Sequence, residues 1–272
     1  MFHALHLTPH VDTIGLIPAA GRATRLLPFR YPKELFPIAY HEPDGSAGGV
    51  DVRVVCQDAL DCLAAGAVSK AFVVISDHKF EVMRFLSDGR EYGMELAYLH
   101  QRDICGLPQA IDCAYPWIGD NNTALVLPDT MIEPRETVAI LLDALRRSES
   151  DVVLGVFPTA HPGDLCPVEF DESGRVLGLY DKDATRGISN TWGVAVWTSG
   201  FTEYLHRYLN TGPSRRGTEL ALAEVFMAAS REGLVVTALP VPNGRFVDIG
   251  RRSALLEGRK LIEGRMPAAT LP

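Results

Sequence analysis

The chain has 272 residues, of which 47% are hydrophobic and 22% charged, and its formal charge is −8. This composition is typical of globular proteins, no apolar run approaches the ~20 residues of a membrane span, and the N-terminus lacks the pattern of a signal peptide. The acidic balance disfavours sequence-independent nucleic-acid binding but leaves a small anionic substrate open. The five cysteines form no C-x-x-C pair. They predict reduced thiols in a cytoplasmic protein rather than a zinc cluster.

Apolar runs of strand length alternate with helical patterns through the first half of the chain. Strands are predicted at 13–18, 70–76, 94–100, 123–128 and 151–157. Helices are predicted between them at 52–65, 78–87, 107–115 and 136–147. Nearly continuous apolar strands that alternate with helices indicate a doubly wound α/β fold, with a mostly parallel, mixed sheet covered on both faces. Such sheets bind ligands at the carboxyl ends of their strands.

The second half of the chain is less regular. We expect strands at 167–170, 176–180, 191–198 and 234–240, and helices at 201–209, 218–229 and 253–263. A polar, glycine-rich insert at 41–49 has no assigned role. Because no repeat, low-complexity tract or linker interrupts the pattern, we expect a single domain over 1–272.

The loop after the first strand carries the clearest chemical signal. Its sequence P-A-A-G-R-A-T-R at 18–25 is rich in small residues, which let a backbone approach phosphates closely. Arg22, Arg25, Arg30 and Lys33 gather positive charge in an otherwise acidic chain. The loop matches neither the Walker A pattern nor the G-x-G-x-x-G dinucleotide fingerprint. Alone, it fits a phosphate-binding loop and a tight turn with solvated cations equally well.

Nine sequence blocks, taken in order along the chain, favour the phosphate-binding loop. They are I-P-A-A-G-R-A-T-R-L-L-P at 17–28, P-K-E-L-F-P at 32–37, Q-x-x-x-x-G-L-x-Q-A at 101–110, A-L-V-L-P-D at 124–129, V-E-F-D at 168–171, D-K at 181–182, W-G-V-A-V at 192–196, R-G-T-E-L at 216–220 and F-V-D-I-G at 246–250. With them the chain resembles the sugar-1-phosphate nucleotidyltransferases, in particular the glucose-1-phosphate thymidylyltransferase group. The resemblance implies a nucleotide-binding half at about 13–160 and a sugar-phosphate-binding half at about 161–264.

The resemblance implies where the nucleotide binds. It places the triphosphate against Pro18, Ala19, Ala20, Gly21 and Thr24. Arg25 would hold the departing pyrophosphate, and Lys33 would contact the reacting phosphates. Gln101 and Gly106 match positions that bind the edge of a thymine or uracil ring. A Gln amide both donates and accepts, as that edge requires.

The resemblance also implies a metal site and a sugar-phosphate site. Asp129 and Asp248 match two carboxylates that hold Mg²⁺, which prefers oxygen ligands. Lys182 matches the lysine that binds the sugar phosphate, and with Arg25 and Lys33 completes the expected catalytic set. Glu219, displaced by one inserted residue, matches the glutamate that binds sugar hydroxyls, and Gly193 would allow close approach of the sugar.

Each of these residues also has an ordinary explanation when taken singly, and the chain departs from the family in places. An isolated aspartate more often caps a helix or turn, and a lone lysine is more often solvated. Ala23 replaces a glycine, and Lys33 lies about two residues closer to the first block than usual. Leu165-Cys166 replaces a sugar-contacting Tyr-Gly pair, and A-L-A-E at 221–224 replaces E-I-T-D. These changes leave the sugar undetermined.

We therefore expect a cytoplasmic, Mg²⁺-dependent nucleotidyltransferase that joins a sugar-1-phosphate to dTTP or UTP and releases pyrophosphate. Its partners would be these two substrates, with neither nucleic acid nor membrane, and homo-oligomerisation is left open. One alternative within the class is a UTP-specific enzyme or one that uses a phosphorylated non-sugar alcohol. The alternative of another class is a nucleotide-sugar-binding regulator without turnover. A nicotinamide dehydrogenase is disfavoured because its glycine fingerprint is missing.

Overall fold

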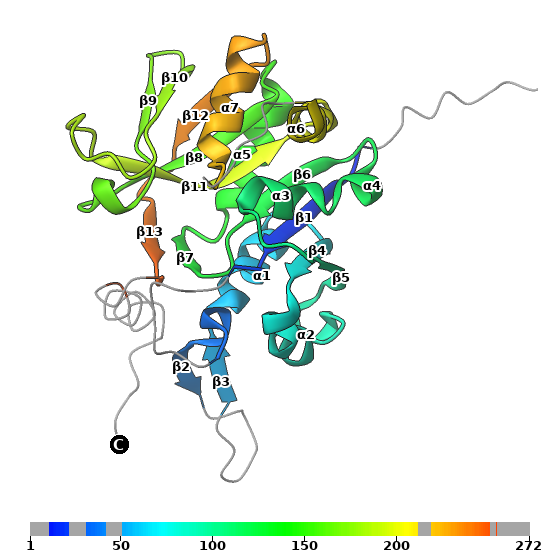
Figure 1. The fold of residues 1–272 in the computed structure, drawn as a ribbon. Coiled ribbons are helices and arrows are strands. Elements are labelled where there is room, and N and C mark those ends of the chain that lie inside the picture. Colours follow the sequence, from blue (N-terminus) through cyan, green and yellow to red (C-terminus); the bar gives the residue numbers. More distant parts are fainter. Residues whose placement is uncertain (1–10, 22–30, 42–50, 212–218, 251–253, 255–272) are drawn as a thin grey trace, which may run out of the picture.

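The computed structural model describes residues 11–21, 31–41, 51–211, 219–250 and 254. At its centre lies a seven-stranded sheet in the order β12-β8-β11-β6-β1-β4-β5 (Figure 1). In that order, the strands span Val236–Pro240, Val152–Pro158, Asn190–Trp197, Asn122–Val126, Thr13–Pro18, Lys70–Ile75 and Glu95–His100. Neighbouring strands are parallel except that β11 runs antiparallel to both β6 and β8. The predicted mostly parallel, mixed sheet is confirmed.

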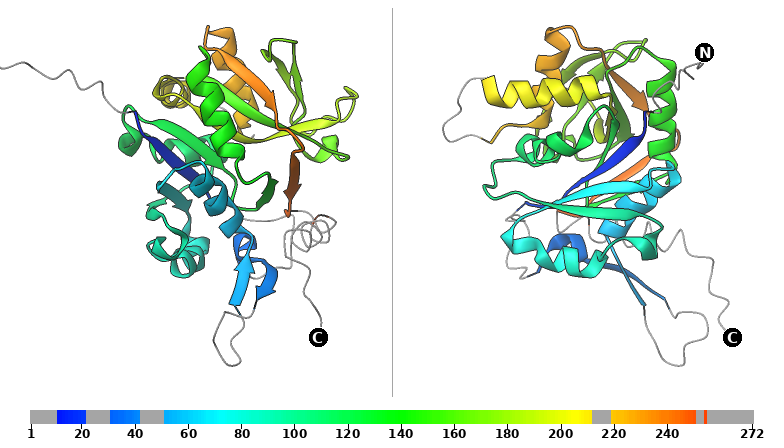
Figure 2. Two further views of the ribbon diagram at one scale, coloured as in Figure 1. Left: turned by 180° about the vertical axis from the view of Figure 1, so that it is seen from behind. Right: turned by 90° about the vertical axis from the view of Figure 1, so that its right-hand side faces the viewer.

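Helices cover both faces of this sheet. One face carries α1 (Cys56–Ala65), α2 (Phe80–Leu86) and α5 (Thr137–Arg147), and the other carries α3 (Leu107–Asp112), α6 (Ser199–Thr211) and α7 (Leu222–Arg231). The right-hand view of Figure 2 shows α5 and α6 on opposite sides of the strands. Within β1, Leu16 packs into the core under α3, α6 and α7, whereas Ile17 packs into the core under α1, α2 and α5. Side chains alternate along a strand, so a strand buried on both faces is apolar throughout.

Three two-stranded ribbons and several short helices extend the sheet. The ribbons pair β2 (Pro37–His41) with β3 (Asp51–Val54), β7 (Thr130–Glu133) with β13 (Arg245–Asp248), and β9 (Val168–Phe170) with β10 (Val176–Leu179). The first two ribbons share a small core that contains Ala39, Met131 and Val247. The short helices are α4 (Tyr115–Ile118), η2 (Lys33–Leu35), η3 (Asp77–Lys79), η4 (Arg90–Tyr92) and η5 (Pro162–Asp164). Among the residues that the structure describes, no helix has the length and apolarity needed to cross a membrane.

The predicted elements need four corrections. The helix predicted at 52–65 begins only at Cys56, because 51–54 form β3 against β2. The helix predicted at 107–115 divides into α3 and α4. The strand predicted at 123–128 ends at Val126, and the unpredicted strand β7 follows it. Residue 221 is extended and its amide hydrogen-bonds to Glu224, so α7 begins at Leu222 rather than at 218. Most of the helix predicted at 253–263 and most of the 41–49 insert lie outside the described residues.

Candidate active site

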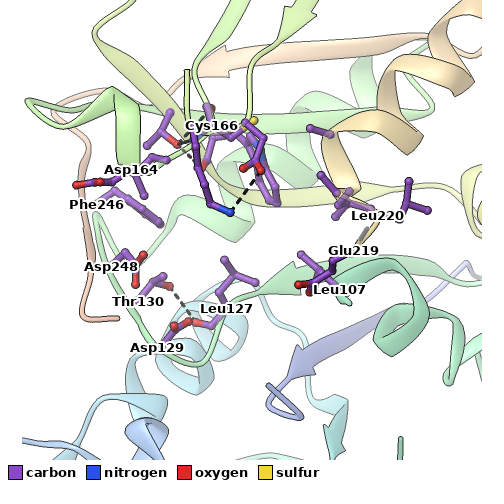
Figure 3. Close-up of a pocket in the computed structure, with 18 residues that line it drawn as sticks. Leu107, Leu127, Asp129, Thr130, Asp164, Cys166, Glu219, Leu220, Phe246 and Asp248 are labelled. Carbon is purple, nitrogen blue, oxygen red and sulfur yellow. Dashed lines mark hydrogen bonds and ion pairs between the residues drawn. The ribbon is translucent and has the colours of Figure 1, made fainter. Parts of the chain in front are cut away.

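A cavity of about 510 Å³ opens beside the ends of several central strands (Figure 3). Its walls come from the segments after β6 and β10, the start of β11, both strands of the β7–β13 ribbon, and the segment that leads into α7. Four predicted site residues line it: Asp129, Lys182, Glu219 and Asp248. In the view of Figure 3, the two aspartates lie on one side of the cavity and Glu219 on the other. The fold therefore brings the predicted metal and sugar residues to one place.

The β7–β13 ribbon places Asp129 next to Asp248. Asp248 is in register with Thr130, and the amide of Ile249 donates a 3.0 Å hydrogen bond to the carbonyl of Asp129. The amide of Gly250 donates to a carboxylate oxygen of Asp248 at 2.7 Å, which fixes that side chain. Within the described ranges no group of three or more His, Cys, Asp or Glu side chains forms a metal site. Two carboxylates nevertheless fit Mg²⁺, which is commonly held by one or two carboxylates together with substrate phosphates.

Lys33 joins this acidic corner from another part of the chain. Its ammonium group forms an ion pair with the carboxylate of Asp129. Burial acts to lower the pKa of Lys33, but the attraction of Asp129, Glu34 and Asp248 outweighs this effect, and the net pKa is raised. Lys33 therefore stays charged beside Asp129.

Lys182 also lines the cavity and has a strained backbone conformation. Its φ angle of 57° is in the left-handed region, which non-glycine residues rarely adopt. The turn is fixed by a hydrogen bond from the amide of Lys182 to the carbonyl of Leu165 at 2.6 Å. The ammonium lies 3.6 Å from a carboxylate oxygen of Asp181, and the side chain is 63% exposed. Strain held by tertiary contacts is common in ligand sites, and here it presents an accessible cation to the cavity.

Glu219 connects the cavity to the predicted base-binding residues. A Cβ on Gly106, where φ is 115°, would stand 2.8 Å from Cγ of Glu219 and 3.2 Å from its Oε1. The side-chain amide of buried Gln101 donates to the carbonyl of Gly106 at 3.5 Å, and its backbone amide donates to Ile75 at 2.8 Å. Gln101 and Gly106 do not line the cavity themselves. They lie behind Glu219, next to the cavity.

Gly193 has a packing role that the sequence did not predict. It lies at a register shift in β11 and does not line the cavity. A Cβ at this position would stand 2.4 Å from the ring of Phe246, a residue that does line the cavity. The absence of a side chain therefore lets Phe246 pack against β11, and close approach of a sugar to Gly193 gains no support.

The predicted phosphate loop is described only at its beginning. Pro18 ends β1, and the amide of Ala19 donates to the carbonyl of Val74 at 2.7 Å. The carbonyl of Ala20 accepts a hydrogen bond from the hydroxyl of Ser76 at 2.9 Å. Ala19 and Ala20 are buried, and Gly21 is exposed. The predicted residues Thr24 and Arg25, together with Arg22, Arg30 and Arg216, lie outside the described residues.

The cavity wall contains residues whose contribution the sequence did not predict. Asp164, Thr191, Trp192 and Phe246 line it in addition to the expected set. Cys166, in place of the family's glycine, adds a thiol to the same wall. Burial raises the pKa of Cys166 to about 12. Asp164 precedes the changed Leu165-Cys166 pair, which is the one sequence signal that could have pointed to it.

Comparisons with known proteins identify the family of this chain. A family model described as "Nucleotidyl transferase" matches residues 14–264. The chain belongs to the nucleotidyl transferase family. It is 26% identical over 259 residues to a glucose-1-phosphate thymidylyltransferase from Streptomyces antibioticus, with 93% of this chain and 67% of that protein covered. It is 24% identical over 253 residues to a low-salt glycan biosynthesis nucleotidyltransferase from Haloferax volcanii, with 91% and 65% covered.

Two further comparisons concern the length of the relatives and a solved structure. The chain spans about two thirds of the length of these two relatives, whereas it covers 82% of a glucose-1-phosphate thymidylyltransferase from Neisseria gonorrhoeae to which it is 23% identical. A solved structure from Bacillus anthracis in complex with sucrose, provisionally named a glucose-1-phosphate thymidylyltransferase, superposes with a TM-score of 0.78. That match covers 92% of this chain and 95% of the other at 16% identity. It confirms the predicted fold.

Proposed function

We propose that the protein transfers a nucleotidyl group from a pyrimidine nucleoside triphosphate to a sugar-1-phosphate. The supporting observation is the meeting of Asp129, Asp248 and Lys182 in one cavity, with Lys33 paired to Asp129, in a chain of the nucleotidyl transferase family. Its relatives include proteins named glucose-1-phosphate thymidylyltransferase. In this proposal residues 13–160 carry the nucleotide and residues 161–264 the acceptor.

The reaction needs positioning and charge neutralisation rather than an enzyme nucleophile. A phosphate oxygen of the sugar-1-phosphate forms a bond to the α-phosphorus. The bond from the α-phosphorus to the bridging oxygen breaks, and pyrophosphate leaves with the electron pair. Lys182, accessible on the cavity wall, holds the acceptor phosphate, while Lys33 neutralises the reacting phosphates. Arg25 is proposed to hold the departing pyrophosphate.

Asp129 and Asp248 are proposed to hold Mg²⁺. When bound, the metal ion would neutralise charge on the phosphates as it develops in the transition state. The β7–β13 register keeps both carboxylates at the cavity, and the Gly250 amide keeps Asp248 from rotating away. The oxygen-only donor set favours Mg²⁺ over the softer transition metals.

The base and the sugar are assigned to opposite sides of Glu219. Gln101 and Gly106 lie behind it, where the Gln101 amide is proposed to pair with the ring edge shared by thymine and uracil. The loop of Pro18, Ala19, Ala20, Gly21 and Thr24 is proposed to hold the triphosphate. Glu219 itself, on the cavity wall, is proposed to bind sugar hydroxyls. We propose dTTP as the preferred nucleotide, with UTP also accepted.

The test is a matrix of nucleoside triphosphates against sugar-1-phosphates, with Mg²⁺, read by pyrophosphate release. Turnover with dTTP or UTP and at least one sugar-1-phosphate is the expected result. A phosphorylated non-sugar alcohol in the same matrix tests the alternative acceptor. Binding of a nucleotide-sugar without pyrophosphate release from any pair would overturn the proposal and favour the regulator.

A further inference from the structure

A buried ion pair lies directly behind the candidate active site. The ammonium of Lys79, in η3 after β4, lies 2.5 Å from a carboxylate oxygen of Glu34 in η2. The side chains of Lys79 and Glu34 are only 3% and 1% exposed. Glu34 is the immediate neighbour of Lys33, the lysine that pairs with Asp129 at the cavity. The pair therefore connects the β4 side of the sheet to the segment that carries Lys33.

Stability alone does not account for two buried charges at this place. Removing a carboxylate and an ammonium from water costs as much as their attraction returns, and apolar residues of the same volume often stabilise a fold equally well. Burial indeed raises the pKa of Glu34, against the opposing attraction of Lys79 and Lys33. Since the pair gains the fold little, its position next to Lys33 becomes the informative fact.

Glu34 competes with Asp129 for the ammonium of Lys33. Both carboxylates, with that of Asp248, act on the charge of Lys33. The 3₁₀ turn of η2 closes with hydrogen bonds from Leu35 to Pro32 and from Phe36 to Lys33, each 3.0 Å, so the backbone around Lys33 is fixed. The hydrogen bonds of this turn join backbone atoms only, so they do not restrain the ammonium group of Lys33. A buried Glu34 without a counter-ion would attract it away from the cavity.

We propose that Lys79 is a positioning residue for nucleotidyl transfer: it neutralises Glu34, so that the ammonium of Lys33 remains directed at Asp129 and the phosphates. The role given to Lys33 rests on the function proposed above. Lys79 itself touches neither the cavity wall nor Lys33 in the described contacts. It acts through Glu34.

The test compares two variants that break the same ion pair from opposite sides. Lys79→Met leaves a buried carboxylate beside Lys33, whereas Glu34→Gln removes that carboxylate and leaves Lys33 its cavity partner. Pyrophosphate release should show kcat reduced about 10- to 100-fold in Lys79→Met, the range for a misplaced reacting group, with little change in KM. Glu34→Gln should keep kcat within about threefold of wild type. The double variant Glu34→Gln/Lys79→Met should return to the level of Glu34→Gln. A purely structural role predicts equal effects of the two single variants and no rescue.

A second measurement does not depend on turnover. A limiting pulse of acetic anhydride, followed by peptide mass spectrometry, reports the accessibility of each amine. Lys33 should be acetylated more slowly in Lys79→Met than in wild type, because it is drawn towards buried Glu34, and at the wild-type rate in the double variant. If wild type releases no pyrophosphate with any substrate pair, the proposed function fails while this measurement still decides the positioning role. Equal acetylation of Lys33 in all variants would overturn that role.

Should Lys79→Met fail to fold, Glu34→Asp replaces it. The shorter side chain keeps the charge but withdraws it from Lys79 towards the backbone beside Lys33. It should therefore lower kcat more than Glu34→Gln does. Equal kcat values for the Asp and Gln variants would overturn the proposal.

Discussion

Gly106 is the position where one methyl group should disturb the acceptor site most sharply. Its φ of 115° and ψ of 177° are in a region that is nearly restricted to glycine. A Cβ would also stand 2.8 Å from Cγ of Glu219 and 3.2 Å from its Oε1. Gly106→Ala therefore combines backbone strain with displacement of a side chain that lines the cavity.

The two effects have separate magnitudes. The strain should lower the free energy of unfolding by about 1–3 kcal/mol. Loss of a hydrogen bond between the carboxylate of Glu219 and the acceptor costs about 1.5–3 kcal/mol. This corresponds to a decrease in kcat/KM for the acceptor of roughly 10- to 150-fold, since 1.4 kcal/mol is a factor of ten.

Gly93→Ala provides the matched control. Gly93 also has a positive φ, 69°, but no described atom lies within 4 Å of the place a Cβ would take. It should lose about 1–2 kcal/mol of stability and keep its kinetics. Urea unfolding gives the stability of both variants, and pyrophosphate release with the acceptor varied gives kcat/KM. If kcat/KM for the acceptor in Gly106→Ala lies within twofold of its value in Gly93→Ala, the contact between Gly106 and Glu219 does not affect acceptor binding and the prediction is refuted.

Three further predictions concern the metal, the base and the cavity thiol. Asp129→Asn and Asp248→Asn should each lower kcat about 10²- to 10³-fold, because a lost Mg²⁺ ligand removes several kcal/mol of charge stabilisation. Both variants should still unfold cooperatively in urea, although Asp129→Asn also loses the ion pair with Lys33. Near-normal turnover in both would contradict the metal assignment. Gln101→Ala should lower kcat/KM for dTTP and UTP by roughly 5- to 150-fold, since an unpaired buried polar group costs ~1–3 kcal/mol. A higher kcat/KM for ATP or GTP than for both pyrimidine nucleotides in wild type would exclude this role of Gln101. The pKa of Cys166 is raised to about 12, so its thiol is neutral at pH 8. Iodoacetamide should therefore alkylate the exposed Cys105 before Cys166. Faster alkylation of Cys166, measured by mass spectrometry, would refute this prediction.

Most of the central sheet could be predicted from the sequence because strands such as β1, β4 and β8 are largely buried and therefore apolar on both faces. β1 matches its predicted bounds, and β4 and β5 differ from them by one residue. The ribbon strands β9 and β10 lie at the strands predicted for 167–170 and 176–180, whereas the strands of the other two ribbons were not predicted. β7 and β13 have four residues each, which is too few for a periodic pattern to show. Three of the four residues of β3 fall within the helix predicted at 52–65. β7 and β13 pair with each other from distant parts of the chain, and local sequence patterns contain no sign of such a partner.

The candidate site also has residues that the sequence predicts and contacts that it does not. Sequence motifs predict four site residues that line one cavity in the structure: Asp129, Asp248, Lys182 and Glu219. Contacts between distant segments could not be derived. Nothing local indicates that Lys79 meets Glu34, because each alone has the pattern of a solvated charge. At Gly193 a motif match suggests a ligand contact, and the structure adds a packing reason for the glycine, the ring of Phe246.

The β7–β13 ribbon also determines when the active site can come into existence. Arg245 of β13 pairs with Glu133 of β7, 112 positions earlier. Closing so long a loop costs entropy that only the completed ribbon repays. A chain emerging from the ribosome can form β1, β4, β5 and β6 while Asp129 still lacks Asp248. Until β13 docks, the chain should therefore lack the proposed metal site, because the second of its two carboxylates arrives only with that strand.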